Sequence, residues 1–355
     1  MKPPAVLRWL LWPASLLFQG VVRVRAWCYR YGIFKQRRLN GVVISVGNLT
    51  VGGTGKTPMV IWLTERLLAE GKRVAILTRG YRGSRGGFAT PEAAKALPNE
   101  SFDLSIASDE VSQYWRRFHN RVMLGAGADR VAWGRKFERA GAEWFLLDDG
   151  FQHLRLARDV EIVLIDASNP FGGGALLPSG LLREPPSALS RADIVVITRS
   201  ERSPASEAVV RRFNQGPIFY AQTELNGVFQ LKEKDLGAEK ADWRRRKFFV
   251  FCAIGNPAAF LVDLRGWGIA VVGSVAYPDH HTYSQKDADD LEKRARAAGA
   301  EALLCTEKDL HHVFLVRFAS FRVHYCRVDL KISDPDAFWQ AVNERVSRRR
   351  AGTTR

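Results

Sequence analysis

The stretch Ser45-Val-Gly-Asn-Leu-Thr-Val-Gly-Gly-Thr-Gly-Lys-Thr57 lies between two segments of different periodicity. A β-branched run, Val42-Val-Ile44, precedes it, and an apolar pattern of helical spacing follows over residues 59–68. A buried strand, a glycine-rich turn and a helix start together form a cradle for nucleotide phosphates. Thr50 stands where the strict form of the pattern has its first glycine. The Gly-Lys-Thr end at a strand-to-helix junction still favours phosphate binding over a purely structural turn.

Glycines in this loop allow positive φ angles, so that successive backbone N–H groups can point at one anion. We expect Lys56 to reach the β- and γ-phosphates and the Thr57 hydroxyl to ligate Mg²⁺. The residues predicted to bind ATP are Gly52, Gly53, Thr54, Gly55, Lys56 and Thr57.

Length and composition limit the class of protein. At 355 residues the chain favours two domains, and 46% apolar residues suffice to build their cores. The four cysteines form no C-x-x-C pair, which argues against a metal cluster or disulfide framework and favours a reducing cytosol. A net charge of +16 predicts an anionic partner: nucleic acid, a phosphorylated substrate or acidic lipid.

Residues 5–34 combine apolar side chains with tryptophans and arginines. The longest apolar run, Leu10 to Phe18, is broken by Pro13 and Ser15, and it is shorter than the roughly 20 residues that span a bilayer. Helical spacing predicts an amphipathic helix at a lipid interface. The alternative is a helix packed on the protein's own core. The predicted apolar face holds Leu7, Leu11, Ala14, Phe18 and Val21, and the opposite face holds Arg8, Ser15, Gln19 and Arg23.

Strand and helix patterns alternate after the phosphate loop. The predicted strands cover 73–78, 122–125, 143–148, 160–166 and 192–198, and the predicted helices cover 57–70, 109–119 and 129–140. Such alternation, with nearly continuous apolar strands, predicts a mostly parallel sheet with helices on both faces, as in P-loop NTPases.

A charged, irregular segment at 226–246 predicts a boundary before a second, smaller α/β domain. Its predicted elements are strands at 248–253, 269–276, 301–305 and 323–328 and helices at 257–265, 284–298 and 334–348. The predicted organisation is an N-terminal membrane-associating helix (1–34), a P-loop core domain (35–226) and a C-terminal α/β domain (227–350) that contributes to the active-site cleft.

Adjacent carboxylates, Asp148 and Asp149, follow an apolar strand. Ligands of such enzymes bind at the carboxyl ends of parallel strands, where a divalent cation relieves the repulsion between the two charges. The two aspartates therefore predict a magnesium site. The alternative is a solvated pair of loop carboxylates without a metal ion. By spacing alone, Asp109 and Glu110 are ordinary helix-cap residues. The motif Pro278-Asp-His-His281 could hold a tuned imidazole, and either histidine could face the site.

Taken together, the chain resembles the tetraacyldisaccharide 4′-kinases of lipid A biosynthesis in Gram-negative bacteria. The resemblance runs in order across nearly the whole chain and rests on Gly47–Pro58, Arg79-Gly-Tyr81, Asp148-Asp-Gly-Phe-Gln-His153, Leu176-Leu-Pro178, Leu182-Arg-Glu-Pro185, Gly255-Asn-Pro257, Pro278-Asp-His-His281 and Thr306-Glu-Lys-Asp309. It implies transfer of the γ-phosphoryl group of ATP to the 4′-hydroxyl of a tetraacylated glucosamine disaccharide 1-phosphate, which gives lipid IVA.

The resemblance also implies roles for individual residues. Asp109 would accept the hydroxyl proton with the help of His280, and Asp148 and Asp149 would serve the Mg-ATP site. Supporting or substrate-binding roles fall to Glu110, Arg130, Arg183 and Asp279. The family's Gly-Asp-Glu-Pro segment reads Ser108-Asp-Glu-Val111 here, so the acidic pair is kept while the flanking turn differs.

An acylated substrate stays in the bilayer, so the resemblance implies a peripheral enzyme at the cytoplasmic face of the inner membrane, held by anionic lipids. We expect no nucleic-acid partner and no obligate protein partner. Two other readings of the sequence are a dimeric regulatory ATPase, which needs no Asp–His pair, and a nucleic-acid ATPase. Aromatic residues interleaved with arginine occur only near the N-terminus and in Trp115-Arg-Arg-Phe118, which gives a weak case for base stacking.

Overall fold

The computed structural model describes residues 5–80, 108–231 and 241–352. Its strands form one eleven-stranded sheet in the order β3-β2-β4-β1-β5-β6-β7-β11-β10-β8-β9. The first half of the sheet contains β1 (Val42–Asn48), β2 (Val74–Thr78), β3 (Met123–Ala126), β4 (Trp144–Asp148), β5 (Val160–Asp166), β6 (Ile194–Thr198) and β7 (Ile218–Gln230). The second half contains β8 (Lys247–Cys252), β9 (Ala270–Ala276), β10 (Ala302–Thr306) and β11 (Val323–Ile332).

Helices cover both faces of the sheet because its central strands are apolar on both sides. All seven residues of β1 are buried. Val42, Ile44 and Val46 face one core with α2 (Lys56–Ala69), α4 (Asp109–Phe118) and α10 (Pro335–Ala351), whereas Val43 faces a core with α5 (Arg130–Arg139). On the second half, α7 (Pro257–Gly266) and α8 (Gln285–Ala297) cover opposite faces, and two short helices are α6 (Pro204–Arg211) and α9 (Leu310–Val313). The predicted fold class is confirmed.

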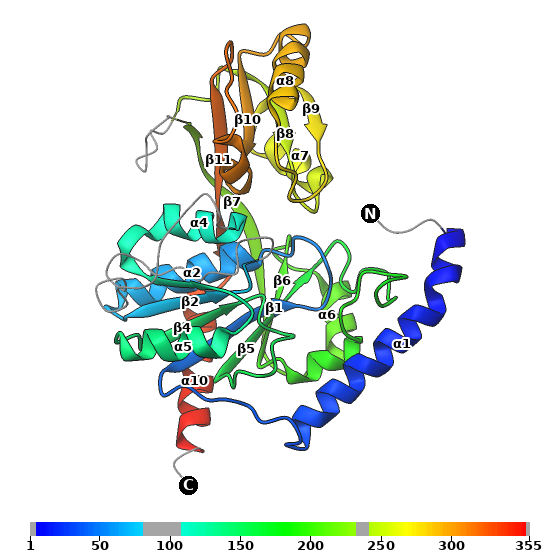
Figure 1. Cartoon of the computed structure of the whole chain (residues 1–355), viewed down its shortest axis with the longest axis vertical. Coiled ribbons are helices and arrows are strands. Elements are labelled where there is room, and N and C mark those ends of the chain that lie inside the picture. The colour runs from blue at the N-terminus through cyan, green and yellow to red at the C-terminus, as the bar shows by residue number, and fades with distance from the viewer. Residues whose placement is uncertain (1–4, 81–107, 232–240, 353–355) are drawn as a thin grey trace.

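The two halves of the sheet meet at β7 and β11, which pair antiparallel, whereas the other neighbouring strands of the described sheet pair parallel. These two strands connect the lower and upper parts of the molecule in Figure 1. The sequence patterns did not predict β7. Its middle carries Asn226-Gly227, a pair typical of turns, and the register shifts there by one residue opposite Arg327 and Val328.

The C-terminal helix returns to the first half of the molecule. After β11 the chain enters α10, whose Phe338, Trp339 and Val342 belong to the core that contains β1 and α2. The Trp339 indole donates a hydrogen bond of 2.7 Å to Glu70 on the turn after α2. Figure 1 places α10 below the first half, far from α7 and α8. The predicted C-terminal domain therefore does not keep its last helix, and the predicted boundary falls inside β7. Independent folding of the two halves remains a prediction.

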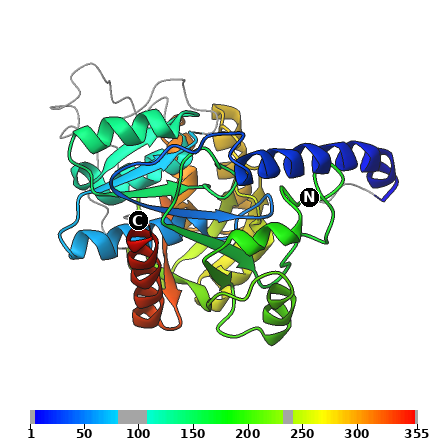
Figure 2. The same cartoon turned by 90° about the horizontal axis from the view of Figure 1, so that it is seen from below.

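Helix α1 (Ala5–Arg30) lies along one side of the molecule (Figure 2). The two predicted faces of this helix have different surroundings. Ser15, on the predicted polar face, is buried and its hydroxyl donates to Ser179 Oγ at 2.8 Å. Val21, on the predicted apolar face, is 59% exposed and is therefore not packed on the protein's core. In the part of the chain that the structure describes, no helix has the length and apolar content needed to cross a bilayer.

Candidate active site

The phosphate-binding loop connects β1 to α2, as predicted. Gly52 and Gly55 have φ angles of 119° and 88°, which residues with a side chain rarely adopt. A Cβ atom on Gly52 or Gly53 would meet nothing within 4 Å, so their backbone faces open space. Gly47 has a different function, because a Cβ there would lie 2.5 Å from the Cβ of Phe151. The loop is therefore shaped to bring backbone N–H groups close to a ligand.

A cleft of about 1040 Å³ opens above this loop. It is lined by the loop, by the carboxyl ends of β2, β4 and β6, and by side chains of the second half. Gly255, from the turn before α7, is close enough to the loop that a Cβ on it would lie 3.4 Å from the Gly53 nitrogen. Thirteen of the fourteen predicted site residues line this cleft. The remaining one, Asp109, contacts His280, which lines it.

Asp149 is held by cations on the floor of the cleft. Arg183 Nη1 donates to both of its carboxylate oxygens, at 2.8 and 2.7 Å, and Lys56 Nζ lies 3.5 Å from Oδ1. Burial would raise the pKa of this carboxyl, but the charges of Lys56 and Arg183 hold it at about 2. Because of these contacts, the Asp149 carboxylate is ionised and is fixed beside the phosphate-loop lysine. The backbone of Asp149 has a φ angle of 48°.

Asp148 lies deeper, at the buried end of β4. Burial raises its pKa to about 6, and the charges of Asp149 and Glu110 add to the rise. Among the described residues its Oδ1 atom has no hydrogen-bond partner, and the Tyr114 hydroxyl faces it without meeting hydrogen-bond geometry. A buried oxygen without a partner requires an explanation. Together with Asp149 and the Thr57 hydroxyl, it offers the oxygen ligands that Mg²⁺ prefers, so this donor set fits a magnesium ion.

Arg130 is buried at the start of α5 and donates to the Asp149 carbonyl at 3.2 Å. Burial lowers its pKa to about 10, and the charges of Asp148 and Asp149 oppose that effect. It remains a cation at neutral pH. The cluster of Lys56, Arg130 and Arg183 concentrates positive charge around the two aspartates, which suits a polyphosphate and its metal ion.

Asp109, at the start of α4, contacts histidines of the second half. Ser108 caps this helix by accepting from the Val111 amide at 3.4 Å, so the chain keeps a helix cap despite its changed flanking turn. His280 Nδ1 lies 2.8 Å from Asp109 Oδ2, and His312 Nε2 lies 2.9 Å from Asp109 Oδ1. His280 faces the site, whereas His281 stacks on Tyr277 and pairs with Asp287.

Ionisation of this pair follows from its contacts. Burial would raise the pKa of Asp109, but hydrogen bonds from His280 and His312 hold it far below its usual range. The hydrogen bond to Asp109 raises the pKa of His280, against burial and the charge of Lys308. Lys308 Nζ lies 3.4 Å from His280 Nε2 and 3.3 Å from Asp279 Oδ1. A cation beside Nε2 favours the tautomer in which Nδ1–H donates to Asp109.

A buried ion cluster fixes α4 to the second half. Glu307, just after β10, accepts from Gln113 at 2.9 Å and from Arg117 and Arg327 at 3.2 Å each. Arg117 also donates to Asp329 at 2.8 Å. Asp109 therefore lies on a helix of the first half whose position is determined by contacts with the second half. The predicted supporting residue Glu110 lies next to it and lines the cleft.

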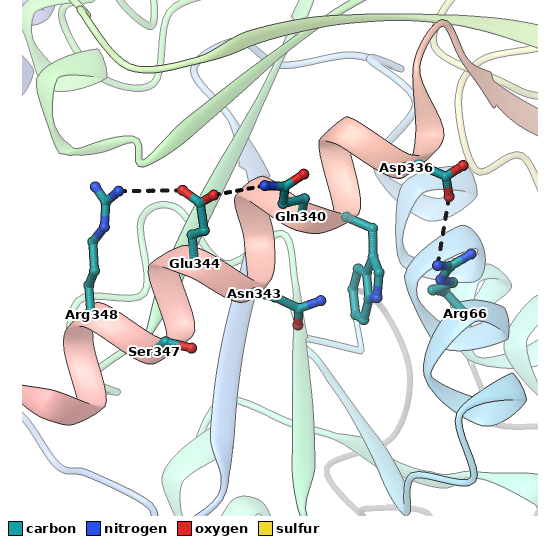
Figure 3. A pocket seen from close by; sticks show the side chains of 8 residues that line it. Arg66, Asp336, Gln340, Asn343, Glu344, Ser347 and Arg348 are labelled. Atoms are coloured by element: carbon teal, nitrogen blue, oxygen red, sulfur yellow. Dashed lines mark hydrogen bonds and ion pairs between the residues drawn. The ribbon is translucent and has the colours of Figure 1, made fainter.

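A second cavity, between α2 and α10, is unrelated to this chemistry (Figure 3). Its charged side chains pair with one another: Arg66 with Asp336 at 3.8 Å and Arg348 with Glu344 at 3.4 Å. Figure 3 shows these side chains extending from the two helices, with Arg66 on α2 and the other three on α10. None of the predicted site residues lines it.

Comparison with known proteins agrees with this geometry. A family profile described as tetraacyldisaccharide-1-P 4′-kinase matches residues 7–347. A tetraacyldisaccharide 4′-kinase of Pelobacter propionicus is 37% identical over 338 residues, which cover 94% of this chain and 91% of that relative. The corresponding protein of Geobacter metallireducens is 38% identical over 341 residues, with 94% and 97% covered. The chain belongs to this family.

The fold comparison gives the same family. A crystal structure of LpxK from Aquifex aeolicus in complex with ATP has 30% sequence identity and a TM-score of 0.74, and the match covers 96% of this chain and 99% of that one. Three residues at or near the site were not singled out from the sequence. Lys308 was quoted only as part of a motif, Arg199 follows β6 and pairs with Asp166 at 3.1 Å, and His312 contacts Asp109. Lys308 and Arg199 follow the carboxyl ends of strands, a position that could have signalled them.

Proposed function

We propose that this chain is the kinase that transfers the γ-phosphoryl group of ATP to the 4′-hydroxyl of tetraacyldisaccharide 1-phosphate, which gives lipid IVA. The observation that carries the proposal is the Asp109–His280 pair beside the same cleft as the phosphate-binding loop. A nucleotide switch needs only the loop. A transferase also needs a group that accepts a proton from the incoming hydroxyl, and this pair provides one.

The first half binds the nucleotide in this proposal. The backbone of Gly52–Gly55 and the Lys56 ammonium hold the phosphates, and Arg130 and Arg183 surround them with positive charge. Mg²⁺, held by Asp148 and Asp149 with the Thr57 hydroxyl, would neutralise charge that develops on the phosphates. Lys56 Nζ lies 3.2 Å from Asn48 Oδ1 as well as near Asp149, so its ammonium is already directed along the loop.

Asp109 prepares the acceptor. Its low pKa keeps the carboxylate ionised, so it can orient a sugar hydroxyl and accept its proton as the new P–O bond forms. His280 donates to the other side of that carboxylate and stabilises its position. Glu110 and Asp279, both at the edge of the cleft, have supporting roles near the acceptor. Phosphoryl transfer depends mainly on positioning and charge neutralisation, and these residues supply both.

The same proposal places the protein at the cytoplasmic face of the inner membrane as a peripheral enzyme. On α1, Leu17 and Val24 are 73% and 61% exposed and Trp27 is 52% exposed, an apolar outer face with a tryptophan suited to a lipid interface. Phe18 and Val21 of the same helix line the cleft. An acylated substrate could therefore pass from the bilayer along α1 toward the phosphate loop.

Deletion of residues 1–25 should lower activity on membrane-presented substrate much more than it lowers ATP hydrolysis without acceptor. The reason is that the deletion removes the lipid-facing surface and leaves β1 and its loop in place. The measurement compares vesicle-embedded with detergent-solubilised substrate for both proteins. Equal losses in all three assays would show that the helix only supports the fold.

The regulatory ATPase reading is tested by His280→Ala. Loss of the histidine should lower phosphoryl transfer about 100-fold or more while ATP binding stays near wild type, because His280 contacts the proposed base. Calorimetric ATP binding and transfer from γ-labelled ATP measure the two effects. Unchanged transfer in the variant would favour a switch. The nucleic-acid reading loses one of its two candidate stacking segments, because Trp115 and Phe118 are buried.

A further inference from the structure

The Asp109 carboxylate has an imidazole at each of its two oxygens. His280 Nδ1 lies 2.8 Å from Oδ2, and His312 Nε2 lies 2.9 Å from Oδ1. The two histidines come from different elements, since His280 follows β9 and His312 belongs to α9. Only the first of these contacts belongs to the Asp–His pair of the proposed function.

The polar contact of His312 is directed at Asp109. Within residues 5–80, 108–231 and 241–352, its Nδ1 atom is buried and has no hydrogen-bond partner. A neutral imidazole has one N–H donor and one bare nitrogen. With Nδ1 left as the bare nitrogen, Nε2–H donates to Asp109. The imidazole therefore serves the carboxylate and no other polar group among these residues.

A rigid turn holds His312 in place. Asp309, which precedes α9, accepts from the Ala253 amide at 2.8 Å and from the Tyr283 hydroxyl at 2.9 Å. It also accepts from Thr306 in a reciprocal capping box. The turn is thus fixed to β8 and to the loop before α8. The terminal torsion of an aspartate is broad, so one donor leaves the plane of its carboxylate free to turn. Two donors on separately fixed elements determine that plane.

We infer that His312 is a positioning residue that orients the Asp109 carboxylate toward the acceptor hydroxyl. The inference rests on the proposed role of Asp109 as the base. The contacts also act on its charge: burial favours protonation of Asp109, and the hydrogen bonds from His280 and His312 lower its pKa. One ring nitrogen of His312 contacts Asp109 and the other is buried, so His312 acts through Asp109 and not on the substrate.

Three substitutions at His312 and one at its neighbour test this role. His312→Ala should lower kcat by roughly 10- to 100-fold, because a misplaced base loses much of its effect, and it should leave the KM for ATP unchanged. His312→Gln should recover most of the activity, because its amide nitrogen can reach the position of Nε2. His312→Asn, which is one methylene shorter, should stay slow. The Gln and Asn variants carry the comparison if the alanine variant unfolds.

His311→Ala is the matched control, since His311 is on the same short helix. Asp109, His311 and His312 also have possible metal ligand atoms within 4.8 Å of one another. A metal site would need both histidines, whereas the positioning role needs only His312. Wild-type kcat in His311→Ala supports the inference. Equal losses in His311→Ala and His312→Ala would overturn it in favour of a metal site.

A double-substitution cycle separates this role from general stability. With Asp109→Asn already in place, His312→Ala should cause no further loss of kcat, because its effect passes through the missing carboxylate. Equal losses in both backgrounds, or equal kcat for the Gln and Asn variants, would overturn the inference. A slow Asp109→Asn enzyme with a fully active His312→Ala enzyme would overturn this inference alone. A fully active Asp109→Asn enzyme would overturn the proposed base as well.

Discussion

Asp109→Asn should lower the rate of phosphoryl transfer by roughly 10²- to 10⁴-fold, the range that a well-placed general base contributes. Asparagine keeps the size of the side chain and can still contact His280 and His312, but its amide cannot accept the proton of the hydroxyl. Asp109 does not line the nucleotide cleft, and the ion pairs of Lys56 and Arg183 in the described part of the chain are with Asp149. Binding of Mg-ATP should therefore stay close to that of the wild type.

The measurement is single-turnover transfer from γ-labelled ATP, with ATP binding followed separately by calorimetry. Glu110→Gln, which removes the neighbouring charge on the same helix turn and keeps Asp109, should lower the rate much less than Asp109→Asn, because Glu110 has only a supporting role. A loss of ATP binding that equals the loss of rate would contradict the assignment, since Asp109 would then support the nucleotide site instead of activating the acceptor.

Asp148→Asn should have opposite effects on stability and activity. The pKa of Asp148 is raised to about 6 because the charged form of its carboxyl is unfavourable in the buried site. Without a metal ion, the ionised carboxylate therefore destabilises the folded protein. Between about pH 4 and pH 6 the folded state binds more protons than the unfolded chain, so stability from this group falls as pH rises through that window. At neutral pH the asparagine variant should gain about 2–3 kcal/mol of unfolding free energy, at 1.36 kcal/mol per pKa unit.

Activity should fall at the same time by roughly 10²- to 10³-fold, because loss of a metal ligand removes several kcal/mol of charge stabilisation. Chemical unfolding at pH 4 and pH 7, with and without Mg-ATP, measures the first effect. The stability gain should be seen at pH 7 and disappear at pH 4, and Mg-ATP should stabilise the wild type more than the variant. A destabilised variant at pH 7 with normal activity would rule out the metal-ligand assignment.

Local patterns predicted most of the fold. The central strands are short and almost wholly apolar, and each ends in glycine or polar residues, so residues such as Val42–Asn48 can be recognised without tertiary information. The failures come from segments where tertiary contacts decide. In β7 the Asn226-Gly227 pair predicts a turn, but pairing with β11 absorbs it as an irregularity in register. Contacts with the distant β1–α2 core, which no local pattern reports, determine the position of α10.

The site residues also fall into those that local motifs reveal and those that only tertiary packing brings together. The loop and Asp148-Asp149 are contiguous motifs at strand ends, so their chemistry is visible in the sequence. The partner of Asp109 was available only through resemblance, because His280 is 171 positions away along the chain. His312 carried no local signal. It lies in a pair of histidines after a capping box, and only the packing of α9 against α4 brings it to the carboxylate. On α1, the sequence places Ser15 on the polar face but does not show that it is buried, because its partner Ser179 lies 164 positions away.

The most direct measurement incubates the full-length protein with γ-³²P-labelled ATP, Mg²⁺ and tetraacyldisaccharide 1-phosphate in vesicles, then locates the new phosphate on the purified lipid by NMR. The account predicts label in the lipid fraction as a monoester at the 4′ position, formed by the wild type and lost in Asp109→Asn. ATP hydrolysis by a folded, nucleotide-bound protein with no label in the lipid, or label at another position, would contradict it.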